Sequence, residues 1–89
     1  MKILFKTVLL KKLDHIKQTD INLYRKIQKQ IYIFRTDISH PSLRNHKLQG
    51  NLHNTYSISI TMSVRMLYFK EGETAVFFEI GTHDEVYRK

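Results

Sequence analysis

The segment from residue 43 to residue 52 holds the first group of side chains that could do chemistry. It places His46 beside Lys47, with Arg44 two positions earlier. An imidazole accepts a proton near neutral pH and cations hold a phosphate, so this composition fits a phosphodiester site. The alternative is an ordinary surface loop anchored by its leucines, with a solvated histidine. Composition alone favours the surface loop.

A second candidate, Arg65, lies inside the otherwise apolar run of residues 64–68. Strand alternation puts it on one face with Leu67 and Phe69, unless a strand end leaves it in solvent. An arginine in the middle of a strand is salt-bridged, exposed at an edge, or directed at an anion in a concave sheet. Without further information, the structural interpretations are favoured.

The C-terminal segment adds His83, followed four residues later by Tyr87. The two side chains share a face if the segment turns helically. Histidine exchanges protons at neutral pH, and tyrosine stacks on a base or hydrogen-bonds a phosphate. A capped terminal turn with a solvated histidine is again the simpler alternative.

No metal, cofactor or disulfide is expected. The chain has no cysteine, and His40, His46, His53 and His83 form no short paired ligand motif. The absence of cysteine suits a reducing cytosol. Lys6 interrupts the apolar N-terminal stretch and no small-residue cleavage site follows, so we expect neither a signal peptide nor a membrane span, and a cytoplasmic protein.

Charge is distributed unevenly along the 89 residues, whose net charge is +7. Residues 1–50 hold eleven Lys and Arg against three Asp, whereas residues 51–89 hold four against five acids. The basic first half fits an electrostatic footprint for a polyanion, and a lysine-rich solvated helix surface explains it equally well.

The elements that must position these side chains follow from periodicity. Residues 2–6 form a short β run, and helical spacing begins at Thr7. Asp20 is the expected N-cap of a second helix, which fades near Asp37. The two helices carry the apolar stripes Leu9, Leu13 and Ile16, and Leu23, Ile27, Ile31 and Phe34.

The second half of the chain predicts three strands. These cover residues 56–61, 64–70 and 74–80, with a tight turn at residues 71–73. Gly81 is expected to end the last strand and Thr82 to cap a short terminal turn. The order is β-α-α-β-β-β, which predicts a single α+β domain over residues 1–89, with two helices on one face of a twisted antiparallel sheet.

Three segments together resemble the RelE/ParE toxin superfamily, and in particular its YafQ-like branch of endoribonuclease toxins. These are residues 43–52 (LRNHKLQGNL), 63–68 (SVRMLY) and 80–87 (IGTHDEVY). From residue 43 to residue 87 the resemblance lies in the motifs, and before that only in the architecture. The family fold is likewise a leading strand and two helices packed on an antiparallel sheet.

The resemblance implies metal-independent cleavage of messenger RNA, typically on the ribosome, by attack of the 2′-hydroxyl on the adjacent phosphate. His46 and His83 resemble the histidines that move protons. Arg65 matches the arginine that stabilises charge on the phosphate, and Tyr87 matches a terminal aromatic that orients the substrate. Arg44 and Lys47 are then phosphate contacts.

Where the branch usually carries Asp, His and Asp, this chain has Ser57, Ser59 and Ser63. Serine is no base near neutral pH, although it hydrogen-bonds phosphate. The implied partners are a cognate antitoxin, mRNA and the ribosome. Two alternatives stay open, a gyrase inhibitor of the ParE type without nuclease activity and a non-catalytic RNA-binding module.

Overall fold

The structure is a computed structural model that describes residues 1–49 and 54–87. Its elements are β1 (Lys2–Phe5), α1 (Thr7–Thr19), α2 (Ile21–Thr36), the 3₁₀ turn η1 (Pro41–Leu43), β2 (His46–Lys47), β3 (Thr55–Ser59), β4 (Val64–Glu71), β5 (Thr74–Thr82) and α3 (His83–Tyr87). The α+β class and the β-α-α-β-β-β order are confirmed. The structure adds η1 and the two-residue strand β2 before β3, and the terminal turn is a short helix.

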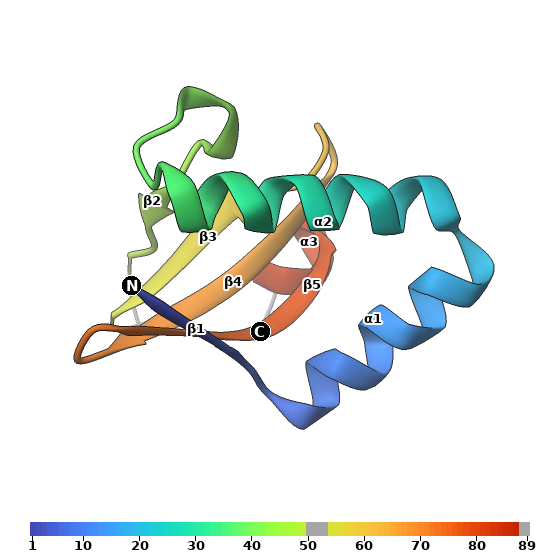
Figure 1. Ribbon diagram of the computed structural model, residues 1–89, viewed down its shortest axis with the longest axis horizontal. Coiled ribbons are helices and arrows are strands. Elements are labelled where there is room, and N and C mark those ends of the chain that lie inside the picture. Colours follow the sequence, from blue (N-terminus) through green and yellow to red (C-terminus); the bar gives the residue numbers. More distant parts are fainter. Residues whose placement is uncertain (50–53, 88–89) are drawn as a thin grey trace.

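The five strands form one sheet in the order β1-β5-β4-β3-β2 (Figure 1). Strands β2 to β5 pair antiparallel, but β1 runs parallel to β5, with Leu4 opposite Val76. The sheet is therefore mixed, which corrects the expectation of a purely antiparallel one. A parallel neighbour needs a long connection between the two strands, and here the chain between β1 and β5 includes both long helices.

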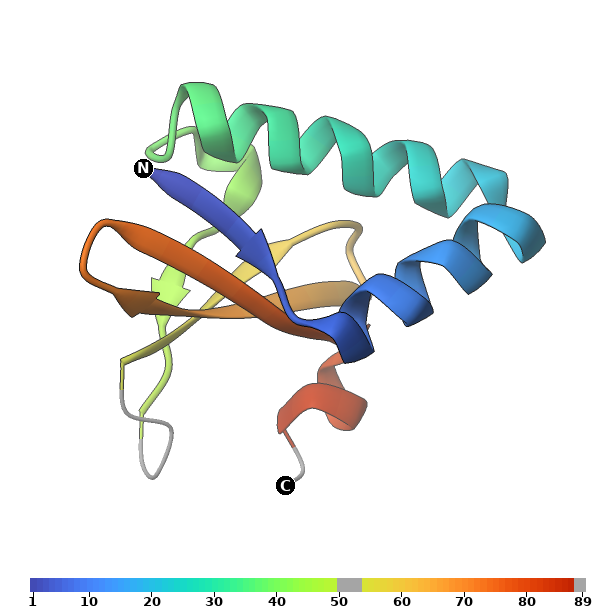
Figure 2. The ribbon, with the colours of Figure 1, turned by 60° about the horizontal axis from the view of Figure 1, so that its bottom comes forward.

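Helix α2 covers one face of the sheet, and α3 lies on the opposite side (Figure 2). The predicted cap of α2 is confirmed, because the Asp20 carboxylate accepts a hydrogen bond of 3.1 Å from the Leu23 amide. The helix ends at Thr36 with Asp37 as its C-cap, where the apolar pattern fades. None of the helices within residues 1–49 and 54–87 is both long and apolar enough to cross a membrane.

The core lies between α2 and the sheet and centres on three aromatic rings. Phe34 of α2 meets Tyr68 and Phe77 edge to face, with ring centroids 5.0 and 5.2 Å apart. Such pairs add about 0.5–1.5 kcal/mol each beyond their burial. The predicted stripes of α1 and α2 supply the buried residues Leu9, Ile27 and Ile31. The helix pair is thereby fixed relative to β4 and β5.

A β-bulge interrupts the pairing of β4 with β5. Leu67 lies opposite Glu79 and Tyr68 opposite Phe77, so Phe78 has no partner across the ladder. Strict alternation from Phe77 would direct Glu79 into the core. The extra residue instead brings Ile80 into the core and leaves Phe78 and Glu79 outside it. The bulge reconciles the sequence of β5 with a continuous apolar core.

The predicted turn between β4 and β5 is confirmed, with Gly72 at a φ of 61°. Glycine adopts this backbone conformation without steric cost. Gly81 does not end β5, which continues to Thr82. A Cβ at Gly81 would lie 3.1 Å from the Glu85 Cβ and 3.3 Å from a Val86 methyl. The glycine therefore allows α3 to fold back closely against the end of β5.

Candidate functional site

The two histidines that carry the predicted chemistry line the same surface hollow. It has a volume of about 300 Å³ and is lined by His46, Leu48, Gln49, His83 and Tyr87. His46 and the two residues after Lys47 come from β2 and its continuation, and His83 and Tyr87 come from α3. The fold thus brings together side chains that are 37 positions apart in the sequence.

Arg65 lies next to this hollow, on the sheet face that is turned away from α2. Its Nε donates to the Ser57 hydroxyl at 2.5 Å, and its Nη2 donates to the Arg44 carbonyl at 3.0 Å. Arg65 shares this face with Leu67, as strand alternation predicts. The partner of Arg65 on β3 is Ser59, and the partner of Leu67 is Ser57. A guanidinium has five N–H donors, so these two bonds fix its plane and leave others for an anion.

His46 is held by the same carbonyl. Its Nδ1 lies 3.2 Å from the Arg44 oxygen and 3.5 Å from Arg65 Nη2. One nitrogen cannot donate to the carbonyl and accept from the guanidinium at once. We assign the proton to Nδ1, because the carbonyl contact is shorter and the oxygen has lone pairs for both donors. In this tautomer the other ring nitrogen, Nε2, is free to accept a proton.

Ser57 connects Arg65 to Tyr87. Its hydroxyl accepts from the Tyr87 hydroxyl at 2.7 Å as well as from Arg65 Nε, and the residue is fully buried. The Tyr87 ring packs edge-on against the His83 ring, with centroids 4.3 Å apart. A continuous chain of contacts therefore runs from His83 through Tyr87, Ser57 and Arg65 to His46.

The other residues expected in the site lie around this chain of contacts. The side chains of Arg44 and Lys47 are exposed. His46 is opposite Ser57 on β3 and Lys47 is opposite Tyr56, so the Lys47 side chain lies on the other face of β2 from His46. Ser59 is the last residue of β3, and its hydroxyl donates to the Thr61 carbonyl at 2.8 Å. Ser63 belongs to the connection between β3 and β4, where its amide donates to the Thr61 hydroxyl at 3.2 Å. The structure therefore brings Ser57 to the chain of contacts and uses Ser59 and Ser63 in a turn.

The position of α3 depends on a reciprocal cap at its start. The Thr82 amide donates to the Glu85 carboxylate at 2.7 Å, and the Glu85 amide donates to the Thr82 hydroxyl at 3.3 Å. The predicted cap at Thr82 is confirmed, with Glu85 as a second member. The hydrogen bond from the Thr82 amide, followed by the one with its side chain, lowers the pKa of the Glu85 carboxyl.

Two supporting residues, Asn45 and Gln30, were not predicted. The Tyr68 hydroxyl leaves the core to donate to the Asn45 side chain at 3.0 Å, next to Arg44 and His46. Burial raises the pKa of Tyr68, so the phenol stays a donor at neutral pH. The buried Gln30 amide of α2 donates to the carbonyls of Ser42 and Ser59 at 3.2 and 2.7 Å. Nothing local in the sequence indicates these contacts, because each partner lies at least 12 residues away.

Metal binding finds no support in the described ranges 1–49 and 54–87, where no group of three or more His, Cys, Asp and Glu side chains could hold an ion. His40 accepts from the Ser42 amide at 3.1 Å and so belongs to η1. His53 lies outside the described residues.

Comparison with known proteins identifies the fold. No protein-family model matches the sequence, and no curated protein matches it significantly. Three solved structures illustrate the structural likeness. A YoeB/ParE toxin from Agrobacterium tumefaciens is 19% identical with a TM-score of 0.77, covering 93% of this chain and 99% of that one. YafQ from E. coli is 13% identical with a TM-score of 0.75, covering 97% of each chain.

The third is a heterotetrameric YoeB–YefM toxin–antitoxin complex from Staphylococcus aureus, 21% identical with a TM-score of 0.72, covering 93% of this chain and 97% of that one. The chain has the fold of these RelE/ParE-type toxins over nearly its whole length, as the sequence predicted.

Proposed function

We propose that this protein is the toxin of a type II toxin–antitoxin system and that it cleaves messenger RNA at the ribosome, in the cytoplasm and without a metal ion. The observation that carries the proposal is the chain of contacts from His83 to His46 at one hollow, with the Arg65 guanidinium next to His46. A phosphodiester needs this combination of proton exchange and positive charge.

In the proposed reaction, the 2′-hydroxyl of the RNA attacks the adjacent phosphorus. His46 Nε2 takes the 2′ proton, and the free N–H donors of Arg65 stabilise the charge that builds up on the phosphate oxygens. The bond from phosphorus to the 5′-oxygen breaks, and protonated His83 gives its proton to that oxygen. The products are a 2′,3′-cyclic phosphate and a 5′-hydroxyl end.

The remaining residues prepare this arrangement. Tyr87 is fixed by Ser57 at 2.7 Å and lies against His83, so it orients the acid and faces the RNA. Arg44 extends the positive charge to a neighbouring phosphate, and Lys47 contacts the RNA backbone from the other face of the edge strand β2. The reaction needs no aspartate at the positions of Ser57, Ser59 and Ser63, because two imidazoles supply both proton transfers.

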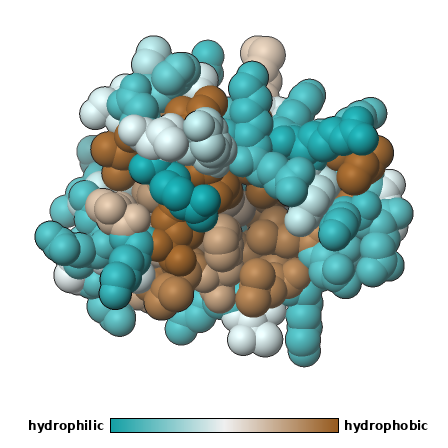
Figure 3. Space-filling model, in the orientation of Figure 1, coloured by the Kyte–Doolittle hydropathy of each residue, from teal (hydrophilic) through white to brown (hydrophobic). Residues whose placement is uncertain are grey.

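The proposed antitoxin would cover an apolar hollow of about 330 Å³ between β1, α1 and α2. Figure 3 shows apolar side chains gathered in this region, with hydrophilic ones around it. Phe5, Leu13, Ile27 and Ile31 line the hollow, with Asp14 and Lys17 also at it. A partner segment with an apolar face is complementary to this surface. The YoeB–YefM toxin–antitoxin complex provides a precedent within the fold.

The test is to express the wild type and His83→Ala in a bacterium and to map new RNA 5′-hydroxyl ends. Loss of one proton-transfer group costs about 10²- to 10⁴-fold in rate, so the variant should produce few such ends. His15→Ala is the matched control, because His15 is an exposed histidine on α1. It should cleave like the wild type.

The same experiment separates the alternatives. Growth arrest by both proteins without new RNA ends would contradict the nuclease and favour a gyrase inhibitor. Binding to RNA that neither leads to cleavage nor responds to His83→Ala would indicate a non-catalytic RNA-binding module.

A further inference from the structure

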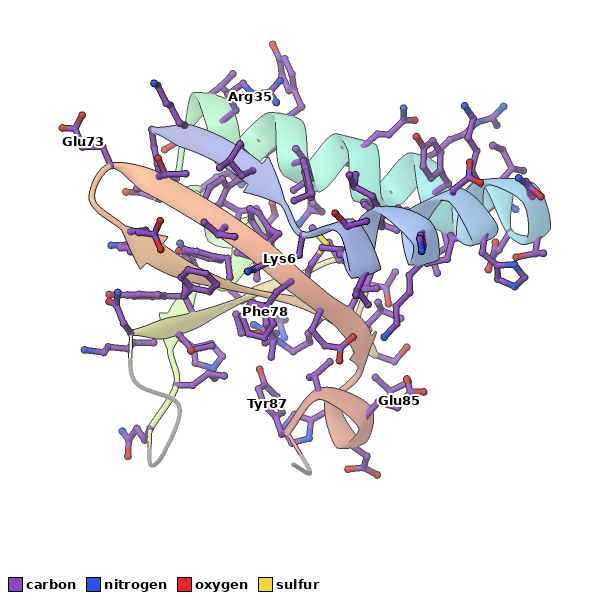
Figure 4. All side chains as sticks on the ribbon, turned by 90° about the horizontal axis from the view of Figure 1, so that it is seen from below. Lys6, Arg35, Glu73, Phe78, Glu85 and Tyr87 are labelled. Atoms are coloured by element: carbon purple, nitrogen blue, oxygen red, sulfur yellow. The ribbon has the colours of Figure 1, made fainter. Side chains whose placement is uncertain are left out.

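The sheet face that carries Arg65 continues beyond the hollow as a strip of aromatic and basic side chains. The Phe69 and Phe78 rings lie 5.8 Å apart at 43°, and Lys6 Nζ lies 5.9 Å from the centre of the Phe69 ring. Both phenylalanines are half-buried and stay outside the core cluster. In Figure 4, Phe78 lies between Lys6 and Tyr87.

The strip lies on the same face of β4 as the candidate site, with the buried Leu67 between them. Arg65, Leu67 and Phe69 alternate on one face of the strand, and Leu67 is opposite Ser57, which holds Tyr87. Phe69 is four positions from Arg65, which corresponds to about 13 Å along a strand. Val76 and Phe78 lie on this face by alternation from the buried Phe77, and the bulge leaves Phe78 without a partner on β4.

We infer that this strip, consisting of Lys6, Phe69 and Phe78, binds a nucleotide of single-stranded RNA that flanks the scissile phosphate. Aromatic rings beside a cation are the arrangement that binds single strands without sequence preference, since the bases stack on the rings and the cation contacts the backbone. The exposed Leu4 beside the strip extends its apolar surface. The positive charge of Lys6 favours an RNA strand over a second copy of this basic chain as the ligand.

The nearby acid does not oppose an RNA strand. Glu79, which follows Phe78, is paired with Lys12 of α1 at 2.5 Å. Its charge is compensated by Lys12, and Lys6 is the charged member of the strip itself. The exposed Glu71 lies two residues beyond Phe69, at the end of β4. The inference rests on the proposed function for the direction of the strand, but the binding of RNA to the strip does not require cleavage.

The experiment measures binding apart from chemistry. The probe is a short fluorescent single strand with 2′-deoxy sugars, which lack the attacking hydroxyl, and its affinity is read by anisotropy. Phe78→Leu and Phe69→Leu keep apolar packing but remove the ring, and each should weaken binding. Loss of a stacked base corresponds to about 5- to 150-fold in affinity. Phe78→Tyr should bind like the wild type.

Tyr32→Leu is the matched control, because Tyr32 is an exposed aromatic on α2, on the other side of the sheet. It should leave the affinity unchanged. Lys6→Gln should weaken binding and lower the slope of log affinity against log salt by about 0.7, the value for one phosphate contact on a single strand. A circular dichroism melt of each variant checks that the fold is kept.

The outcomes distinguish this inference from the proposed function. Ring-dependent binding by a protein that does not cleave RNA would support the strip and contradict the nuclease. Cleavage by a protein whose affinity is the same in Phe78→Leu, Phe69→Leu and Tyr32→Leu would overturn the strip and leave the nuclease standing. A wild-type dimer that Phe78→Leu dissociates, with unchanged affinity for the strand, would also overturn it and assign the face to a second copy.

Discussion

At the scale of single residues, the site is organised by two acceptor oxygens. The Arg44 carbonyl accepts from Arg65 at 3.0 Å and lies 3.2 Å from His46. The Ser57 hydroxyl accepts from Arg65 at 2.5 Å and from Tyr87 at 2.7 Å. The left-handed backbone of Arg44, with a φ of 44°, turns its carbonyl toward both donors. These two oxygens therefore set the orientation of three candidate catalytic side chains.

Replacement of Arg65 by lysine tests the importance of this geometry. Lysine keeps the charge but lacks the planar fork that reaches Ser57 and Arg44 at once. We expect the cleavage rate of Arg65→Lys to fall about 10²- to 10³-fold, as for the loss of a donor that stabilises developing charge. The measurement is single-turnover cleavage of an RNA substrate. Arg25→Lys, an exposed arginine on α2, is the control. Equal rates for both variants would show that charge alone suffices.

At the scale of elements, the placement of α3 decides whether His83 and Tyr87 reach the hollow. The helix has only five residues, so it is too short to be stable alone. It is held by the reciprocal cap between Thr82 and Glu85, by the close approach at Gly81 and by the buried Val86. The charged form of Glu85 is part of that cap, which makes the element sensitive to acid.

The pH dependence follows from the sign of the pKa shift. The pKa of Glu85 is lower in the folded protein than its usual 4.5, so the cap is complete above that value and is lost as the pH falls through the lowered pKa. The amide chemical shift of Thr82, followed by NMR, should titrate in this acidic range. Glu85→Gln should abolish that titration and reduce cleavage at neutral pH.

Glu73→Gln is the control for this change, because Glu73 is an exposed acid in the turn between β4 and β5. It should leave the Thr82 titration and the cleavage rate as in the wild type. A Thr82 amide that does not respond to acid would contradict the role of the carboxylate in the cap.

The elements also show what the sequence can and cannot predict. Asp20, Thr82 and Gly72 act on their nearest neighbours, so their roles as caps and turn are visible in the sequence. The pairing of β1 with β5 joins residues about 70 positions apart, as Lys2 with Thr74. The bulge at Phe78 arises because Ile80 rather than Glu79 belongs in the core. Such features depend on the whole fold and have no local signal.

The site follows the same rule. The resemblance indicated His46, Arg65, His83 and Tyr87, whose types are informative in themselves. The fold places the two histidines and Tyr87 around one hollow, with Arg65 beside His46. Ser57 was expected as a substrate contact, but its full burial makes it an internal support. Asn45 and Gln30 were not predicted, because the structural role of such a polar residue depends on a hydrogen-bond partner that is distant in the sequence.

At the scale of the whole molecule, the lysines of α2 and the hollow lie on different sides of the sheet. The exposed Lys26 and Lys29 are on α2, above one face of the sheet, while His83 and Tyr87 belong to α3 on the opposite side (Figure 2). Lys11 and Lys12 of α1, in contrast, line a hollow together with Thr82 and Glu85 at the start of α3. The surface of α2 therefore fits a large polyanion that extends around the protein, such as the proposed ribosome, or an acidic antitoxin.

This separation predicts different salt dependences for two ligands. Replacement of Lys11, Lys12, Lys26 and Lys29 by glutamine should flatten the dependence of ribosome binding on salt, because fewer counterions are released. Lys12 should contribute least, since Glu79 already compensates its charge. A variant in which only Lys26 and Lys29 of α2 are replaced should bind a short single strand with nearly the wild-type slope, because α2 lies across the sheet from the hollow. Sedimentation with ribosomes and anisotropy of the labelled strand measure the two slopes.

Lys70→Gln removes one charge outside the helices and serves as the reference. Lys70 belongs to β4, and its Nζ lies 4.5 Å from the centre of the Tyr56 ring. An unchanged slope for ribosome binding in the fourfold variant would remove the helices from the polyanion footprint. A slope that falls equally for both ligands would mean that one RNA path includes the helices and the hollow, against the separation by the sheet. A slope that changes only for ribosome binding would mean that the helix lysines bind the ribosome and that the hollow binds the strand to be cleaved.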